Sequence, residues 1–222
     1  MKETKLKFGV IGGGSWATAL IKILSENNND INWYLRNTEN IEFIKKNSHN
    51  PNYLSSVELN LKKLKISAEI NEVVEASNVI IIAVPSEYVN DEMKKIDLDI
   101  SKKIIICALK GLVPETNLLF GEHMQKHFGI SPNKFLVIGG PCHAEEVALE
   151  KLSYLTIGSS NLELCKIISE KFSCKYINVK ASDDVIGIEY ASMLKNIFAL
   201  AVGISNGLGS VSYTHLRAHE TR

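Results

Sequence analysis

The segment FGVIGGGSWATAL, residues 8–20, carries the clearest structural signal of the chain. Gly12, Gly14 and Ala17 match the pattern G-x-G-x-x-G/A, directly after an apolar run and before a stretch of helix length. Gly12 permits a tight turn, Gly14 lets a pyrophosphate approach the backbone, and Ala17 allows close packing of helix on strand. Free N–H groups at the helix start favour an anion. The pattern therefore predicts a dinucleotide-binding turn; a merely structural glycine turn is the alternative.

Around this segment, apolar runs of strand length alternate with stretches of helix length. Because nearly every residue of these runs is apolar, both faces of each strand would be buried, which is typical of parallel sheets covered by helices. The pattern predicts an α/β fold with a doubly wound, Rossmann-type parallel sheet. The expected strands are 5–11, 31–35, 79–84, 103–107 and 134–138, with a weaker one at 65–68 and edge strands at 153–157 and 175–179, and the expected helices are 15–26, 38–46, 87–95, 115–127 and 162–172.

The pattern changes at Asp183. Residues 183–204 have few polar side chains and no proline, which predicts a helix that is apolar on nearly every face. Such a helix needs surrounding helices, so we expect residues 1–182 to form the dinucleotide-binding domain and 183–209 the first helix of a truncated all-α domain. Residues 210–222 change composition abruptly and are interpreted as a non-native tail; a genuine polar extension is the alternative.

Composition excludes several classes of partner. The 25 basic and 25 acidic residues cancel, so no field that attracts nucleic acid or an anionic membrane is expected. The longest apolar runs fall short of the roughly 18 to 20 residues that span a bilayer, and the N-terminus lacks a signal-peptide pattern. We therefore expect a cytoplasmic protein with a small-molecule substrate and no membrane insertion, and a homodimer stays open. The four cysteines show no CxxC spacing and are read as reduced thiols, with no metal site.

The end of the second strand bears on cofactor choice. A dehydrogenase strict for NAD usually has Asp or Glu there, to bind the ribose 2′-hydroxyl, whereas this sequence has Arg36 in INWYLRN. Arg36 could pair with a 2′-phosphate or stack on adenine; a solvated loop arginine is the alternative. The cofactor is predicted to be NAD or NADP, with NADP or dual specificity favoured.

Three further motifs stand at the carboxyl ends of predicted strands, where open parallel sheets bind ligands. In AVPSEY, Pro85 lies near the expected cofactor path, although Ser86 as a helix N-cap explains the motif about as well. In CALKGL, Lys110 would direct a cation toward an anionic or polarised group; a solvated loop lysine is the alternative. In IGGPCHAEE, the amides near Cys142 could bind a polar substrate; a nucleophilic role for Cys142 is disfavoured, because hydride transfer needs none.

A fourth motif, IEYASMLKNIFAL, places Lys195 in one of the least polar parts of the chain. The small residues Ala191, Ser192 and Ala199 share its helical face and leave room for a ligand. Burial and a neighbouring cation such as Lys110 would favour the neutral amine, which suits proton transfer. A structural lysine that reaches out of the helix is the alternative.

Together these motifs resemble the bacterial NAD(P)-dependent glycerol-3-phosphate dehydrogenases. The resemblance runs through GVIGGGSWATA, HNPNYL, IIIAVPSEYV, KGLVPET and GGPCHAEEVA to EYASMLKNIFALAVGI, in the family's order. It implies a Rossmann domain followed by an all-α domain. It also implies an oxidoreductase that reduces dihydroxyacetone phosphate to sn-glycerol 3-phosphate with NAD(P)H, for glycerophospholipid synthesis.

The resemblance also assigns roles and shows two departures. In the family, Cys142 corresponds to Ser or Thr in many members, and after GISNGLG the helical domain continues with further substrate- and cofactor-binding residues. An inactive cofactor-binding fragment of the enzyme is therefore one alternative, and a methyltransferase, which usually has an acid where Arg36 stands, is a weaker one. The implied roles are cofactor contact for Ser15, Trp16, Arg36 and Ala144, contact with cofactor and substrate for Lys110, substrate contact for Gly140 and Cys142, and proton donor or acceptor for Lys195.

Overall fold

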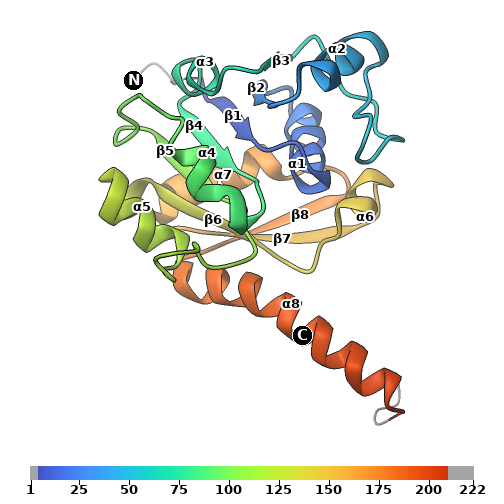
Figure 1. The fold of residues 1–222 in the computed structure, drawn as a ribbon, viewed down its shortest axis with the longest axis vertical. Helices are drawn as coiled ribbons and strands as arrows, with labels where there is room; N and C mark the ends of the chain where they lie inside the picture. Colours follow the sequence, from blue (N-terminus) through green and yellow to red (C-terminus); the bar gives the residue numbers. More distant parts are fainter. Residues whose placement is uncertain (1–4, 210–222) are drawn as a thin grey trace.

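A computed structural model describes residues 5–209, so the predicted tail at 210–222 lies outside the described residues. One sheet of eight strands, in the order β3-β2-β1-β4-β5-β6-β7-β8, forms the centre of the molecule (Figure 1). The strands are β1 (Lys7–Ile11), β2 (Asp30–Tyr34), β3 (Leu64–Ser67), β4 (Val79–Ile82), β5 (Ile104–Cys107), β6 (Phe135–Gly139), β7 (Ser153–Gly158) and β8 (Ile177–Ser182). The helices are α1 (Ser15–Glu26), α2 (Thr38–Asn47), α3 (Ile70–Glu75), α4 (Val89–Met93), α5 (Phe120–Phe128), α6 (Ala144–Ala148), α7 (Leu162–Phe172) and α8 (Val185–Gly207), with short 3-10 helices η1 (Ser86–Tyr88) and η2 (Pro132–Lys134).

Both faces of the sheet are buried, as the apolar runs predict. In β4, Val79 and Ile81 join the hydrophobic cluster that contains α1 and α7. Ile80 and Ile82 point the opposite way, into the cluster that contains α3, α4 and α5. Successive strand side chains alternate between faces, so a strand with no polar residue requires helices on each side. The predicted Rossmann-type α/β fold is confirmed.

The sheet is mixed, because its last two strands reverse direction. Strands β1 to β6 are parallel, β7 pairs antiparallel to β6, and β8 pairs parallel to β7. The two edge strands expected at 153–157 and 175–179 are therefore present, with α7 between them. Their direction depends on the path of the chain after β6, which the apolar runs do not encode.

Most predicted helix bounds agree with the structure, and α1 matches in full. The helix expected at 115–127 instead begins at Phe120. Residues 113–118 form a turn closed by a bridge between Val113 and Leu118, with Glu115 and Asn117 at positive φ. Left-handed backbone interrupts a helix, which explains the late start. The helix expected at 87–95 is split into η1 and α4, and α3 and α6 were not predicted.

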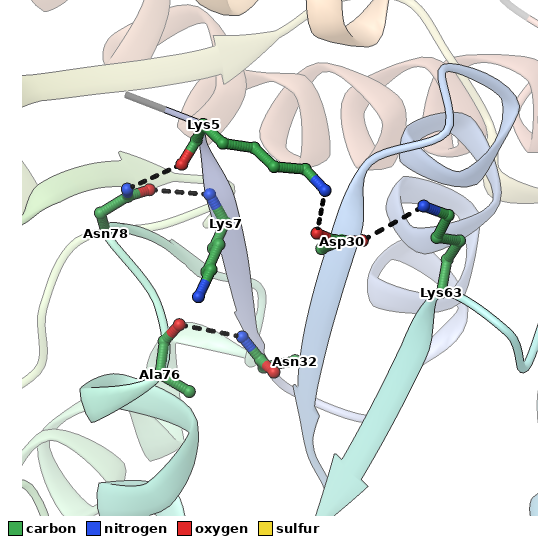
Figure 2. Close-up of polar contacts among 7 residues, drawn as sticks. All are labelled: Lys5, Lys7, Asp30, Asn32, Lys63, Ala76 and Asn78. Carbon is green, nitrogen blue, oxygen red and sulfur yellow. Dashed lines mark hydrogen bonds and ion pairs between the residues drawn. The ribbon is translucent and has the colours of Figure 1, made fainter. Parts of the chain in front are cut away.

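Polar contacts at the amino ends of the first three strands hold their register (Figure 2). Asp30 at the start of β2 lies between Lys5 and Lys63, which precede β1 and β3, and pairs with both. Asn78 accepts the N–H of Lys7 at 2.8 Å and donates to the carbonyl of Lys5. The hydrogen bond to Lys5 is the main cause that lowers the pKa of Asp30. These contacts occupy the amino edge of the sheet. Ligands are expected at the opposite edge, where the carboxyl ends of the parallel strands lie.

Helix α8 begins on the sheet and then leaves it (Figure 1). Asp184 caps it by accepting the N–H of Gly187 at 2.8 Å. Ile188 packs over Gly139 and Gly158, where a Cβ would come within 2.7 Å and 2.6 Å of its side chain. Beyond Lys195, nearly all of its side chains are exposed. The first turns are therefore seated by glycines of β6 and β7, while the later turns have no partner among the described residues.

The expectation that no segment is long enough to span a membrane is not met. Within the described residues, α8 is one helix long and apolar enough to do so, judged by length and composition. The apolar runs looked short in the sequence because polar residues such as Glu189 and Lys195 interrupt them. One such helix is weak evidence, since core helices of soluble proteins meet the same criterion.

Candidate functional site

The glycine turn after β1 has the geometry that the motif predicts. Gly12 has a φ of +131°, and a Cβ there would clash with the carbonyl oxygen of Ala83, just after β4. The indole Nε1 of Trp33 in β2 donates to the carbonyl of Gly12 at 2.7 Å. Only glycine adopts this backbone without strain, so the turn is held close against two neighbouring strands.

The start of α1 is open to a ligand. Gly14 is the N-cap residue, no side chain caps the helix, and its first turn holds no acidic residue. A Cβ on Gly14 would meet no atom within 4 Å. The first N–H groups of a helix without a side-chain cap attract an anion. The chemistry and the space at this turn fit a dinucleotide pyrophosphate.

Asn50 connects the motif HNPNYL to this turn, a role that the sequence analysis did not assign. Its side-chain amide donates to the carbonyl of Gly13 at 3.2 Å and to the hydroxyl of Thr18 at 2.9 Å. Its oxygen accepts the N–H groups of Asn52 and Tyr53. Asn50 is buried. The only sequence signal was an Asn-Pro-Asn loop next to the first βαβ unit.

A first cavity of about 460 Å³ lies beside the turn. It contains four of the predicted cofactor residues, Gly12, Gly14, Arg36 and Pro85. Ser86 opens η1 without making a capping hydrogen bond, which removes the N-cap explanation of AVPSEY. Residues not predicted also line the cavity, namely Gly13, Tyr34, Leu35, Asn37, Asn40, Ile44, Asn50, Asn52, Tyr53, Val84, Tyr88 and Glu92.

A carboxylate lies beside Arg36 although none ends β2. Glu92 in α4 places Oε1 3.9 Å from Nη1 of Arg36, and its side chain is only 5% exposed. The arginine guanidinium also lies 6.0 Å from the ring centre of Tyr88. Arg36 therefore faces the first cavity in contact with groups that come from a distant part of the sequence.

A second cavity, of about 470 Å³, brings together the other predicted residues. Trp16, Lys110, Gly140, Cys142 and Lys195 all line it. The remaining lining residues come from the loops that follow β5 and β6, from β6 and β7 themselves, and from the first turns of α8: Ala108, Leu109, Ile138, Gly139, Pro141, Thr156, Ile188, Ala191 and Ser192. The start of α1 borders both cavities, because Gly14 lines the first and Trp16 the second.

Two lysines converge on the second cavity. The ammonium of Lys110 lies 5.8 Å from the ring centre of Trp16, and that of Lys195 donates to the carbonyl of Cys142 at 3.5 Å. The pKa of Lys110 is lowered, first by desolvation and then by the charge of Lys195. Two cations that repel each other favour an anion between or beside them. The cavity therefore suits a small anionic ligand.

The loop after β6 shapes the floor of this cavity. Gly140 has a φ of +141°, and a Cβ there would clash with the carbonyl of Tyr154. The thiol of Cys142 donates to the same carbonyl at 2.8 Å. Burial raises the pKa of the Cys142 thiol, which argues against a thiolate nucleophile, as the sequence analysis concluded.

Two predicted cofactor residues line neither cavity. Ser15 and Ala144 each open a helix, α1 and α6, and their side chains are absent from both sets of lining residues. Ala199, predicted on the ligand face of α8, also lies outside the cavities and is exposed. Any contact from Ser15 or Ala144 would use backbone N–H groups at a helix start.

Comparisons with known proteins agree with this geometry. Residues 7–165 match the family model for the N-terminus of NAD-dependent glycerol-3-phosphate dehydrogenase, and residues 184–218 match the model for its C-terminus. Glycerol-3-phosphate dehydrogenase [NAD(P)+] of Macrococcus caseolyticus is 35% identical over 208 residues, 92% of this chain and 62% of that protein. The protein of the same name from Bacillus pumilus is 33% identical over 205 residues, 91% of this chain and 59% of that protein.

Solved structures show the same fold. Glycerol-3-phosphate dehydrogenase from Coxiella burnetii superposes with a TM-score of 0.82 at 28% identity, covering 94% of this chain and 63% of that one. The Plasmodium falciparum enzyme superposes with a TM-score of 0.85 at 24% identity, covering 96% and 62%. The chain thus spans about three fifths of the length of the relatives it matches. By the match over residues 7–165, the chain belongs to the NAD-dependent glycerol-3-phosphate dehydrogenase family.

Proposed function

We propose that the chain binds NAD(H) or NADP(H) in the first cavity and dihydroxyacetone phosphate or sn-glycerol 3-phosphate in the second. The observation that carries this proposal is the convergence of Lys110 and Lys195 on one cavity next to the open start of α1. The names of the relatives supply the substrate. The product of the proposed reaction, sn-glycerol 3-phosphate, would be used in glycerophospholipid synthesis. We also propose that the protein is cytoplasmic.

The cofactor would be held by backbone groups and by few side chains. Gly12, Gly14 and Ser15 would present the turn and the first N–H groups of α1 to the pyrophosphate. Arg36 and Pro85, which line the first cavity, would contact the adenosine end, and Trp16, which lines the second cavity, would lie toward the proposed place of reaction. The backbone N–H of Ala144 at the start of α6 is a further proposed contact. When bound, the reduced cofactor supplies a hydride.

Residues of the chain would stabilise the negative charge that forms on the substrate oxygen and would supply its proton. Hydride addition to the substrate carbonyl carbon leaves a negative charge on its oxygen, and the ammonium of Lys195 would donate a proton there. In the reverse direction, the neutral amine would accept it. Lys110 would stabilise the same developing charge. Gly140 and Cys142 would position substrate through the loop after β6.

Replacement of Lys195 tests this role. Lys195→Ala should lower turnover about 100- to 10,000-fold, because a positioned acid contributes that much, while the NADH dissociation constant stays nearly unchanged. NADH fluorescence titration measures binding, and NADH oxidation with dihydroxyacetone phosphate measures turnover. Both are measured on the chain as it stands and on the chain extended by the C-terminal region of the Macrococcus caseolyticus relative.

The matched control is Lys166→Ala, an exposed lysine on α7. Near-normal turnover in the extended Lys195→Ala protein would refute the assignment. A second candidate function is cofactor binding without turnover, favoured by the share of about three fifths of the relatives that the chain covers. NADH binding without substrate-dependent oxidation, restored by the extension, would identify it.

A further inference from the structure

Glu92 is a buried acid at the adenosine end of the first cavity. It is 4% exposed in a helix of five residues, α4, that follows η1. Its Oε2 accepts a hydrogen bond from the Lys95 ammonium at 2.9 Å, and its Oε1 lies 3.9 Å from Arg36 Nη1. The carboxylate of Glu92 therefore lies between two cationic side chains, one of which is Arg36, the residue on which the prediction of cofactor choice rests.

The charge of Arg36 is partly neutralised at this place. Among the described residues that line the first cavity, Arg36 is the one Lys or Arg and Glu92 the one Asp or Glu. The guanidinium also lies over the ring of Tyr88, at 6.0 Å. The Arg36 side chain is 69% exposed, so it can still stack on a planar base. With a carboxylate 3.9 Å away, however, it attracts a second anion less strongly than an arginine with no carboxylate beside it.

The charge of Glu92 acts inside the protein rather than in bulk solvent. Tyr34, the last residue of β2, is buried and lines the same cavity. The pKa of its phenol is raised by desolvation and, next, by the negative charge of Glu92. A group added near Tyr34 and Arg36 would meet the same field.

We propose that Glu92 is a specificity-determining residue that biases this cavity toward NADH over NADPH; this rests on the proposed cofactor binding. A ribose hydroxyl can donate a hydrogen bond to a carboxylate. A phosphate at that position brings a charge of about −1.5 to −2 and is repelled by it. The inference reverses the preference that Arg36 alone predicts, because Glu92 replaces from α4 the carboxylate that the end of β2 lacks.

The test is the ratio of the NADPH and NADH dissociation constants, measured by fluorescence titration of each nucleotide. The unmodified chain should bind NADH more tightly. Glu92→Gln, which keeps the shape and removes the charge, should shift the ratio toward NADPH by about tenfold. Lys95→Gln should shift it the opposite way, because the loss of its ammonium leaves Glu92 less neutralised. Glu87→Gln, an exposed acid in η1, is the matched control and should leave the ratio unchanged.

Lys95 is 44% exposed, so its variant folds even where a change at the buried Glu92 does not. Tighter binding of NADPH than of NADH by the unmodified chain overturns the inference. So does an equal change for both nucleotides in Glu92→Gln, or a Lys95→Gln shift in the same direction as that of Glu92→Gln. Failure of the unmodified chain to bind either nucleotide would instead refute the proposed function.

Discussion

At the scale of single residues, the turn depends on the backbone of Gly12. Its φ of +131° and the carbonyl of Ala83 leave no room for a Cβ. Gly12→Ala should lower the free energy of unfolding by about 1 to 3 kcal/mol, the cost of a strained backbone, and should weaken NADH binding. Urea unfolding and NADH titration measure the two effects. Gly14→Ala is the control: its φ is −79° and its Cβ would meet nothing within 4 Å, so only the weaker N-cap preference of Ala is lost and stability should fall by about 1 kcal/mol or less. Equal destabilisation by both changes would contradict this account.

At the scale of elements, Glu189 ties α8 to α5, because it accepts the N–H of Gly121 at 3.0 Å. Burial raises its pKa to about 7, from 4.5. Between these values the folded chain binds more protons than the unfolded chain, so stability falls as pH rises through this window. The free energy of unfolding lost in full above pH 7 is about 3 kcal/mol.

Glu189→Gln keeps the hydrogen-bond acceptor and removes the titrating group. Urea unfolding should therefore show this variant to be more stable than the parent at pH 8 and similar to it near pH 4.

Glu170→Gln, an exposed change on α7, is the control for this pH effect and should track the parent at both pH values. The prediction concerns the difference in free energy of unfolding between Glu189→Gln and the parent. If this difference were no larger at pH 8 than at pH 4, the carboxylate of Glu189 would not be the cause of the pH dependence.

At the scale of the whole molecule, the outer half of α8 exposes large apolar side chains. From the apolar pattern of this helix we expect Ile186, Met193, Ile197 and Leu200 to lack partners. Ile186, Ile197 and Leu200 are 61%, 57% and 67% exposed, whereas Met193 is half-buried; Phe198, which was not predicted, is 63% exposed. Each such side chain lacks the stabilisation of about 1.5 to 3 kcal/mol that its burial would give.

The chain should therefore bind a hydrophobic dye and self-associate. Dye fluorescence and light scattering measure these two effects. Phe198→Lys with Leu200→Lys should reduce both signals, whereas Ile167→Lys, at one of two exposed large apolar residues on α7, should not. A dye-negative monomer would disprove the prediction.

Local patterns were enough to predict much of the fold. The glycine turn and α1 depend on residues within a few positions of each other, and the apolar run of β4 requires helices on both faces. The carboxyl ends of parallel strands meet at one edge, which is why Arg36, Pro85 and Lys110 could be placed at ligand cavities from the sequence.

Contacts between remote segments could be found only in the tertiary structure. The hydrogen bond from Asn50 to Gly13, the approach of Glu92 to Arg36 and the antiparallel pairing of β7 leave no local pattern. The division into two cavities, with Gly14 on one and Trp16 on the other, likewise follows from how α1, β2 and α8 pack. Residue types and spacing specify backbone shape and burial, whereas the charge that a ligand meets depends on distances between side chains that only folding brings together.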